Sequence, residues 1–302
     1  MLQAELTRTL NKLHERNEQM QKYQDQQHET TQLLQKYQDQ SRQIKYYKMS
    51  HPKRGMAIIF NHSNFKKNLK ATDRPGTFKD TEGLEKILTK LKFEVIMCLN
   101  FTLKEIKDTL RKAALRDHTE SDCIMVIVLS HGRFGKVLAF DTLYDVNTLP
   151  KYFTGDNCPT LAGKPKMFYI SACGGNEEDH GIEAEIEIDT DQIEMDTYEK
   201  YRIPIMADFL ITFSSHPGYI SHRSTLKGTW FIECLCSELE KNAEKLDILT
   251  ILTNVARQIA FYYESKKREQ TEEQITIPQK RKQVPYITST LTRTLQFTGT
   301  NI

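Results

Sequence analysis

The chain has 302 residues, a formal net charge of +2, a hydrophobic fraction of 38% and a charged fraction of 27%. This length predicts one sizeable domain with appendages, or two small domains. The near balance of charge argues against a nucleic-acid-binding protein, and no apolar run approaches the roughly 18 residues that a membrane span requires. Because the first residues lack the basic-then-apolar pattern of a signal peptide, we also expect no secretory leader.

Six cysteines are spread along the chain without the C-x-x-C spacing that is typical of metal sites. We interpret them as free thiols of a reducing compartment, which predicts a cytoplasmic protein. No glycine-rich phosphate loop follows an expected strand, so the sequence indicates no metal, nucleotide or organic cofactor. The cysteines are Cys98, Cys123, Cys158, Cys173, Cys234 and Cys236.

Residues 1–50 differ in composition from the rest, because they contain no glycine or proline and are rich in Gln, Glu, Lys and Leu. The string Gln-Lys-Tyr-Gln-Asp-Gln occurs at 21–26 and again at 35–40, a shift of two heptads. Polar residues interrupt the apolar stripe, so the pattern predicts a helix with a weak coiled-coil seam. A solvated helix or a disordered leader remains an alternative, and docking of an adaptor through this helix is a further hypothesis.

After His51-Pro52, helical and extended patterns alternate, which predicts a largely parallel sheet covered on both faces. The expected strands are Met56–Phe60, Phe93–Cys98, Ile124–Ser130, Lys166–Ala172, Ala207–Ser214 and Val284–Phe297. The expected helices are Thr81–Lys92, Leu103–Arg116, Gly228–Leu239 and Ile248–Tyr263.

Two of the expected strands end at a reactive side chain followed by glycine. The run 124–130 leads into His131-Gly132, and the run 166–172 leads into Cys173-Gly174-Gly175. In an open α/β sheet, reacting groups lie at the carboxyl ends of parallel strands. Taken alone, each side chain is more typical of a structural residue, but together they form a candidate base and nucleophile.

The pentapeptide 171–175, Ser-Ala-Cys-Gly-Gly, resembles the Q-A-C-[RQG]-G signature of caspases, which also have a histidine upstream. The resemblance covers about residues 52–298 and includes Arg74-Pro-Gly-Thr, Ser130-His-Gly, Ser221-His-Arg and Gly228-Thr-Trp-Phe-Ile in family order. Three motifs, Asp247-Ile-Leu-Thr-Ile-Leu-Thr, Cys158-Pro and Tyr201-Arg-Ile-Pro, make it most similar to apical caspases of the death-effector-domain type, although we find no such domains in this sequence.

The resemblance implies a three-layer α/β sandwich with about six mostly parallel strands, and a cysteine endopeptidase that cleaves after aspartate. It implies that Cys173 is the nucleophile and that His131 passes the proton to the leaving amine. The backbone N–H groups of Gly132 and Cys173 would form the oxyanion hole. Arg74 and Arg223 match the two arginines that bind the substrate aspartate, as bidentate guanidinium groups are suited to do.

Three further positions of the implied substrate site are Ser171, Ser221 and His222. Ser171 replaces the glutamine of the family and removes one amide donor from the aspartate pocket, so we expect weaker substrate binding with the aspartate preference retained. His222 stands where relatives usually have an aromatic ring, and we expect the imidazole to keep that packing role.

Residues 176–199 carry many acids and no Lys or Arg, which predicts an exposed segment that is suited to nicking. The resemblance implies self-cleavage of the zymogen here, with Asp189, Asp191 and Asp196 as candidate sites. The predicted organisation is a helical leader (1–50), a large-subunit region (51–189), an acidic linker (190–199) and a small-subunit region (200–302). The last strand resembles the one that pairs caspase units, which predicts a homodimer.

Three functions remain open from the sequence. The first is an aspartate-specific protease of apoptotic or innate-immune signalling that cuts protein substrates. The second is a catalytically weak or inactive caspase-like regulator that dimerises with an active partner, and Ser171 is the one feature that favours it. The third is a coiled-coil interaction protein with an unrelated α/β domain, which the order of the motifs opposes.

Overall fold

In the computed structural model, the chain divides into two compact units. One comprises Met1–Tyr46 with Thr190–Tyr201, and the other comprises Tyr47–Asp189 with Arg202–Ile302. The described residues are 16–17, 20–24, 26–28, 30–31, 45–175, 177, 204–224, 228–266 and 280–297. Those between 16 and 31 are helical, as expected for the N-terminal segment. Asp189, Asp191 and Asp196 lie outside the described residues, and the predicted subunit boundaries stay predictions.

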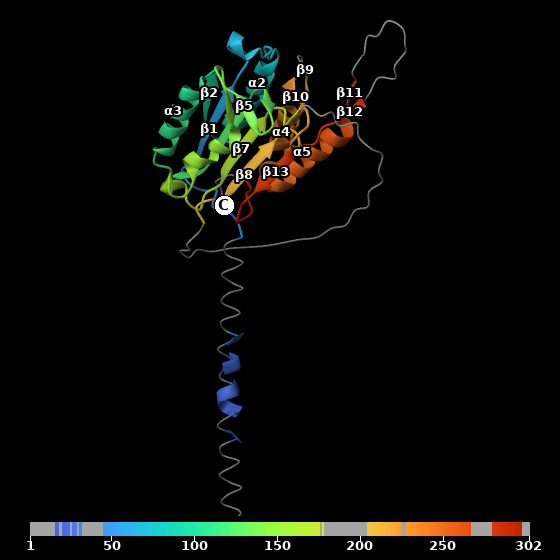
Figure 1. Ribbon diagram of the computed structural model, residues 1–302. Coiled ribbons are helices and arrows are strands. Elements are labelled where there is room, and N and C mark those ends of the chain that lie inside the picture. Colours follow the sequence, from blue (N-terminus) through green and yellow to red (C-terminus); the bar gives the residue numbers. More distant parts are fainter. Residues whose placement is uncertain are drawn as a thin grey trace, which may run out of the picture. The chain divides into compact units, whose positions relative to one another are not determined.

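The second unit is built on a six-stranded sheet with the order β13-β8-β7-β3-β1-β2 (Figure 1). All neighbouring strands are parallel except the edge strand β13, which runs antiparallel to β8. The prediction of a mostly parallel sheet of about six strands is therefore confirmed. The strands are β1 (Lys53–Asn61), β2 (Glu94–Leu99), β3 (Ser121–Leu129), β7 (Lys166–Ser171), β8 (Phe209–Phe213) and β13 (Tyr286–Ser289).

Helices cover both faces of this sheet, and Figure 1 shows α3 on one side with α4 and α5 on the other. Side chains alternate between the faces along each strand: Ile127 packs in the core with α2, α4 and α5, whereas the adjacent Val126 and Val128 pack in the core with α3. The continuous apolar runs thus belong to strands that are buried on both faces. The helices are α2 (Thr77–Lys90), α3 (Leu103–Ala114), α4 (Trp230–Asn242) and α5 (Ile248–Tyr262).

Two sequence-based boundaries were wrong by four residues or more. Helix α2 begins at Thr77 rather than Thr81, because Gly76 adopts a left-handed backbone conformation (φ 84°) that starts the helix there. The last strand ends at Ser289 instead of Phe297. Its continuation leaves the sheet because its carbonyls accept hydrogen bonds elsewhere, from the N–H groups of Tyr47 and Ile248.

Short elements frame the loops that follow the main strands. Strands β4 (Gly132–Arg133), β5 (Lys136–Leu138) and β6 (Leu143–Asp145) form a small antiparallel sheet directly after β3. Strands β9 (Arg223–Ser224) and β10 (Gly228–Thr229) form a hairpin before α4, so Gly228 and Thr229 are extended rather than helical. The remaining short elements are β11 (Ser265–Lys266), β12 (Lys280–Arg281), η1 (Lys67–Leu69), η2 (Val146–Thr148), η3 (Pro150–Phe153) and η4 (Pro159–Leu161).

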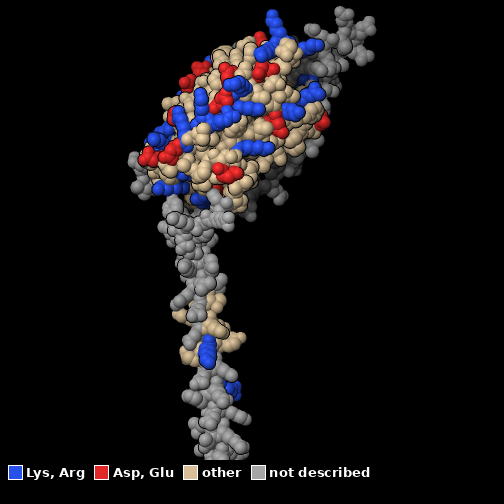
Figure 2. Space-filling view, turned by 60° about the vertical axis from the view of Figure 1, so that its left-hand side comes forward, with Lys and Arg blue, Asp and Glu red and all other residues tan. Residues whose placement is uncertain are grey.

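The surface carries both signs of charge. Figure 2 shows basic and acidic side chains interspersed over one face. On α3, Asp108 pairs with both Lys104 and Arg111 at 2.7 Å. No helix among the described residues is long and apolar enough to span a membrane.

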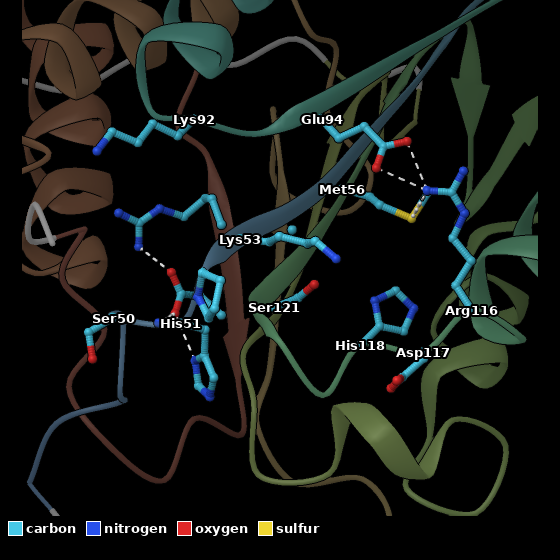
Figure 3. A pocket seen from close by; sticks show the side chains of 14 residues that line it. Ser50, His51, Lys53, Met56, Lys92, Glu94, Arg116, Asp117, His118 and Ser121 are labelled. Atoms are coloured by element: carbon cyan, nitrogen blue, oxygen red, sulfur yellow. Dashed lines mark hydrogen bonds and ion pairs between the residues drawn. The ribbon is translucent and has the colours of Figure 1, made fainter.

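A polar cavity of about 650 Å³ lies where β1 and β3 begin, at the edge of the sheet opposite to the strand ends that carry His131 and Cys173 (Figure 3). Beside it, Asp122 accepts hydrogen bonds from the buried Arg54 guanidinium and from His51 Nδ1, each at 2.8 Å. Glu94 and Arg116, which also line the cavity, form an ion pair at 2.8 Å. These contacts join the segment before β1 to the start of β3.

The Asp122 carboxylate should therefore be a major contributor to stability. We expect Asp122→Ala to lower the free energy of unfolding by about 3–5 kcal/mol, because the buried Arg54 guanidinium loses this carboxylate. Glu120→Ala, which removes an exposed ion pair with Lys53, should cost less than about 1 kcal/mol. Chemical denaturation of both variants tests this, and equal losses would contradict it.

Candidate active site

The pairing of β3 with β7 brings His131 and Cys173 to the same edge of the sheet. The two strands run parallel with Leu129 opposite Ser171, and the Ser130 N–H donates to the Ser171 carbonyl at 3.2 Å. His131 and Cys173 each lie two residues beyond that last register pair. The predicted pair therefore lies on two adjacent strand ends, and both side chains are only partly buried.

The glycines that follow these two residues allow the chain segments to approach closely. A Cβ atom on Gly132 would lie 2.7 Å from the Cys173 carbonyl oxygen, closer than real Cβ atoms come to such an oxygen. A Cβ on Gly175 would lie 2.0 Å from the carbonyl oxygen of Gly218. Gly174 donates to the Tyr219 carbonyl at 2.9 Å and accepts from Phe134 N–H at 2.9 Å. The backbone after the nucleophile is thus held from both sides.

The His131 imidazole is oriented by a backbone carbonyl. Its Nε2 lies 2.8 Å from the Thr72 carbonyl oxygen. A carbonyl only accepts, so Nε2 carries a proton, and Nδ1 is the nitrogen with a free lone pair in the neutral ring. The ring centroid lies 5.2 Å from that of Phe65. Burial lowers the pKa of His131, and the positive charges of Arg74 and Arg223 lower it further against the opposing effect of the Thr72 carbonyl.

The Cys173 thiol lies against the segment that enters β9. Its Sγ is 3.4 Å from the Ser221 amide nitrogen, which donates to it, and 3.7 Å from the Ser221 carbonyl oxygen. Ser221, which the sequence placed among the substrate-binding residues, thus contacts the predicted nucleophile through its backbone.

Arg74 and Arg223 lie near one another and near Cys173, although they come from distant parts of the sequence. Arg74 is buried, and its Nη1 donates to the His62 carbonyl at 2.8 Å and to Thr77 Oγ1 at 3.0 Å. Burial and the charge of Arg223 lower the pKa of Arg74 to about 10. Burial also lowers the pKa of Arg223. Two partly desolvated guanidinium groups therefore stand beside the candidate nucleophile.

Asp80 and Thr229 complete this cluster, and sequence reasoning missed both. The Asp80 carboxylate accepts from the Thr229 N–H at 2.7 Å and from its hydroxyl at 3.1 Å. Burial raises the pKa of Asp80, while Thr229 and the two arginines oppose that rise. No local signal marks Asp80, since an acid in the first turn of a helix is common. Its role depends on the β9–β10 hairpin, where Thr229 pairs with Arg223.

Ser171 and His222 are the two departures from the family pattern. Ser171 is buried at the end of β7, and its hydroxyl lies 3.4 Å from Thr229 Oγ1, so it faces the same cluster as Asp80. The His222 ring stacks on Trp230 with centroids 4.7 Å apart, and the backbone N–H of His222 donates to Gln283 Oε1 at 2.6 Å.

All six cysteines are free thiols, but their surroundings differ. Burial raises the pKa of Cys98 to about 11 and that of Cys236 to about 12. Of the six, only Cys173 and Cys236 are incompletely buried, and Cys173 alone lies beside a histidine at a strand end. Among the described residues, no cluster of His, Cys, Asp and Glu has the geometry of a metal site.

Residues 54–296 match the caspase domain family. The chain belongs to the caspase family. It is 44% identical to Caspase-1 of Spodoptera frugiperda over 257 residues, which is 85% of this chain and 82% of that protein. It is 43% identical to Caspase drICE of Drosophila melanogaster, covering 85% of this chain and 73% of that protein. With Caspase-3 of Mesocricetus auratus the identity is 39%, over 83% and 86% of the two chains.

The fold agrees with this assignment. The crystal structure of Caspase-1 from Spodoptera frugiperda superposes with a TM-score of 0.74, at 44% identity, over 84% of this chain and 95% of that one. This caspase is therefore a cysteine-type endopeptidase. The predicted similarity to the apical subtype is not confirmed, because the matched relatives include drICE, Caspase-3 and Caspase-7, which are effector-type caspases. That prediction rested on three short motifs, whereas the similarity to these relatives extends over 251 to 258 aligned residues.

The surroundings of His131 predict that its ring stays neutral at a lower pH than an ordinary histidine. Because burial and two cationic neighbours disfavour the imidazolium, its titration midpoint should fall below 6.5. The midpoint can be read from the imidazole NMR signals, assigned by their absence in His131→Asn. A midpoint at or above 6.5 would contradict this reading of the site.

Proposed function

We propose that this caspase cleaves peptide bonds after aspartate and acts in apoptotic or innate-immune signalling. The observation that carries the proposal is the position of Arg74 and Arg223. Arg74 lies two residues after Thr72, whose carbonyl oxygen is 2.8 Å from His131, and Arg223 lies two residues after Ser221, whose N–H donates to Cys173 Sγ. A side-chain carboxylate bound there would receive charge-assisted hydrogen bonds from two guanidinium groups. Asp80 balances one of the two positive charges, so the cluster retains a net charge of about +1 for the carboxylate of the substrate.

The reaction follows from the two strand ends. Neutral His131 accepts the thiol proton of Cys173 at Nδ1, and the sulfur attacks the carbonyl carbon after the aspartate. The N–H groups of Gly132 and Cys173 stabilise the negative oxygen. Collapse of this intermediate breaks the C–N bond, and His131 donates its proton to the leaving amine. Water, deprotonated by His131, then hydrolyses the thioester and restores the thiol.

Activation is proposed to require cleavage of the acidic linker and pairing of two chains. Asp189, Asp191 and Asp196 are the candidate cleavage sites, which would separate His131 and Cys173 from Arg223. In the single chain, β13 is an edge strand hydrogen-bonded to β8 on one side, with Tyr286 and Ser289 exposed. A second copy would cover this edge, which an isolated chain leaves open to aggregation.

A catalytically weak regulator that dimerises with an active caspase is the second candidate. The observation that favours it is Ser171, whose short side chain reaches Thr229 rather than extending as the family's glutamine does. Against it stands the complete set of Arg74, His131, Cys173 and Arg223 around one centre.

Peptide hydrolysis separates the two candidates. Under conditions that promote dimerisation, we expect the protein to hydrolyse Ile-Glu-Thr-Asp-coumarin at least about 100-fold faster (kcat/KM) than Ile-Glu-Thr-Ala-coumarin, because the neutral side chain leaves the buried Arg74 and the partly buried Arg223 without a substrate carboxylate. Cys173→Ala should lose at least about a thousandfold in kcat. Equal turnover of both peptides would refute the aspartate pocket, and a dimer without turnover would favour the regulator.

The same preparations test the linker. The active protein should separate into two fragments with the break between Gly181 and Tyr201, whereas Cys173→Ala should keep its intact mass. An active protein that remains uncut there would contradict self-cleavage at these aspartates.

Ser171→Gln should raise kcat/KM for the aspartate peptide by about tenfold, because the amide adds a donor to a charged ligand. Ser171→Met is the matched control, since it has similar length without the amide. If the glutamine and methionine variants give the same kcat/KM for the aspartate peptide, the missing amide donor does not limit how well the pocket binds aspartate.

A further inference from the structure

A cavity of about 720 Å³ borders the catalytic histidine. His131, Gly132 and Thr72 line it, but none of Arg74, Arg223, Ser171, Ser221 or His222 does. The cavity therefore adjoins the reacting centre without sharing residues with the aspartate pocket. No step of the proposed reaction uses it.

Three cations and no acid line this cavity. Lys70, Arg133 and Lys136 are exposed, and none of them forms an ion pair with another residue in the part of the chain that is described. The Arg133 guanidinium lies 5.2 Å from the centre of the Phe134 ring. Three neighbouring positive charges without acidic partners raise the local potential and attract an anionic side chain.

The rest of the lining is largely apolar. Leu69 and Leu138 are half-buried, while Phe134 and Leu143 are 62% and 44% exposed. Large exposed apolar side chains gathered around one hollow are typical of a surface that receives a ligand. The cavity thus offers an apolar contact together with positive charge.

The backbone holds these groups at a fixed position relative to His131. The Leu138 N–H donates to the His131 carbonyl at 2.9 Å, and β5 pairs with β4 so that Lys136 lies opposite Arg133. On the other wall, the Lys66 N–H donates to the Phe140 carbonyl at 2.8 Å, which ties the η1 segment to the same small sheet. The hollow is therefore a formed part of the fold.

Its location indicates which part of a substrate it receives. The aspartate pocket binds the residue before the cleaved bond, and His131 must reach the amine that leaves after that bond. Residues beyond the amine therefore pass His131 on the side away from Arg74 and Arg223. The cavity is lined by His131 and Gly132 and by neither arginine, so it is the hollow next to the reacting centre that is available to these residues.

We propose that this cavity is a subsite for the residues that follow the cleaved bond, and that it selects an apolar residue followed by an acidic one. The proposal rests on the aspartate-directed protease activity proposed above. The apolar residue contacts Leu138 and Phe134, and the acid lies among Lys70, Arg133 and Lys136.

The chain's own acidic linker has this pattern. After Asp191 come Gln192-Ile193-Glu194, and after Asp196 come Thr197-Tyr198-Glu199. In both, the second residue is apolar or aromatic and the third is glutamate. Three extended residues span about 10 Å, which is the scale of a cavity of this volume. Asp189 is followed by Thr190-Asp191, so it places an acid one position earlier.

Two internally quenched peptides test the charge preference. Both contain Ile-Glu-Thr-Asp, followed in one by Thr-Tyr-Glu and in the other by Thr-Tyr-Lys. We expect the unmodified protein to cleave the Glu peptide about fivefold or more faster in kcat/KM, with the ratio falling as salt is raised. Ile-Glu-Thr-Asp-coumarin, which has no amino acid after the bond, is measured alongside.

The double variant Arg133→Glu, Lys136→Glu should reverse the ratio and cleave the Lys peptide faster than the unmodified protein does. A gain on one peptide cannot come from misfolding, so this readout remains valid if the variant is less stable. Lys112→Glu, at an exposed position on α3, is the matched control and should keep the original ratio.

Three outcomes would overturn the proposal. Cleavage of the coumarin peptide with equal rates for the Glu and Lys peptides would refute the subsite and leave the protease standing. A ratio that the double variant and Lys112→Glu change equally would assign the preference to overall charge. No turnover of the coumarin peptide would remove the proposed function, and the subsite with it.

Discussion

The parallel pairing of β3 with β7 is the constraint on which the site depends. It fixes Leu129 opposite Ser171, so that His131 and Cys173 leave the sheet side by side. Because side chains alternate along a strand, a shift by one residue would move every side chain of the shifted strand to the opposite face of the sheet, against other packing partners. The apolar side chains of both faces thus enforce the register that aligns the nucleophile with its base. The stability of the core and the geometry of the reaction have the same cause.

The second constraint is electrostatic. Asp80, which accepts a hydrogen bond from the Thr229 N–H, attracts both Arg74 and Arg223 and offsets part of the repulsion between them. Two guanidinium groups without a carboxylate would be costly to bury side by side. The Asp80 carboxylate balances one of the two guanidinium charges, so the cluster keeps a net charge of about +1. In the proposed function a substrate aspartate supplies the balancing negative charge, so the imbalance would make the pocket selective for an anionic side chain.

The small sheet β4-β5-β6 connects the reacting centre to the basic cavity. It begins at Gly132, directly after the base, and it presents Arg133 and Lys136 from paired strands. The carbonyl of His131 accepts from Leu138 in the same sheet. In the proposed reaction, substrate residues before the cleaved bond would therefore meet one buried and one partly buried guanidinium group, and residues after it would meet exposed cations and apolar side chains.

The sequence alone determined the layer order, the strand count and the family, since buried strands read as continuous apolar runs and the Cys and His motifs are local. It also identified Arg74 and Arg223, although only through the resemblance to caspases. It gave no indication of Asp80, Thr229 or the Thr72 carbonyl. It also placed the end of the last strand eight residues too late, at Phe297 instead of Ser289. These features depend on contacts between segments that are distant in the sequence, where backbone carbonyls and buried charges find partners that no local pattern encodes. Composition and periodicity thus decided which elements form, and tertiary packing decided which groups surround Cys173.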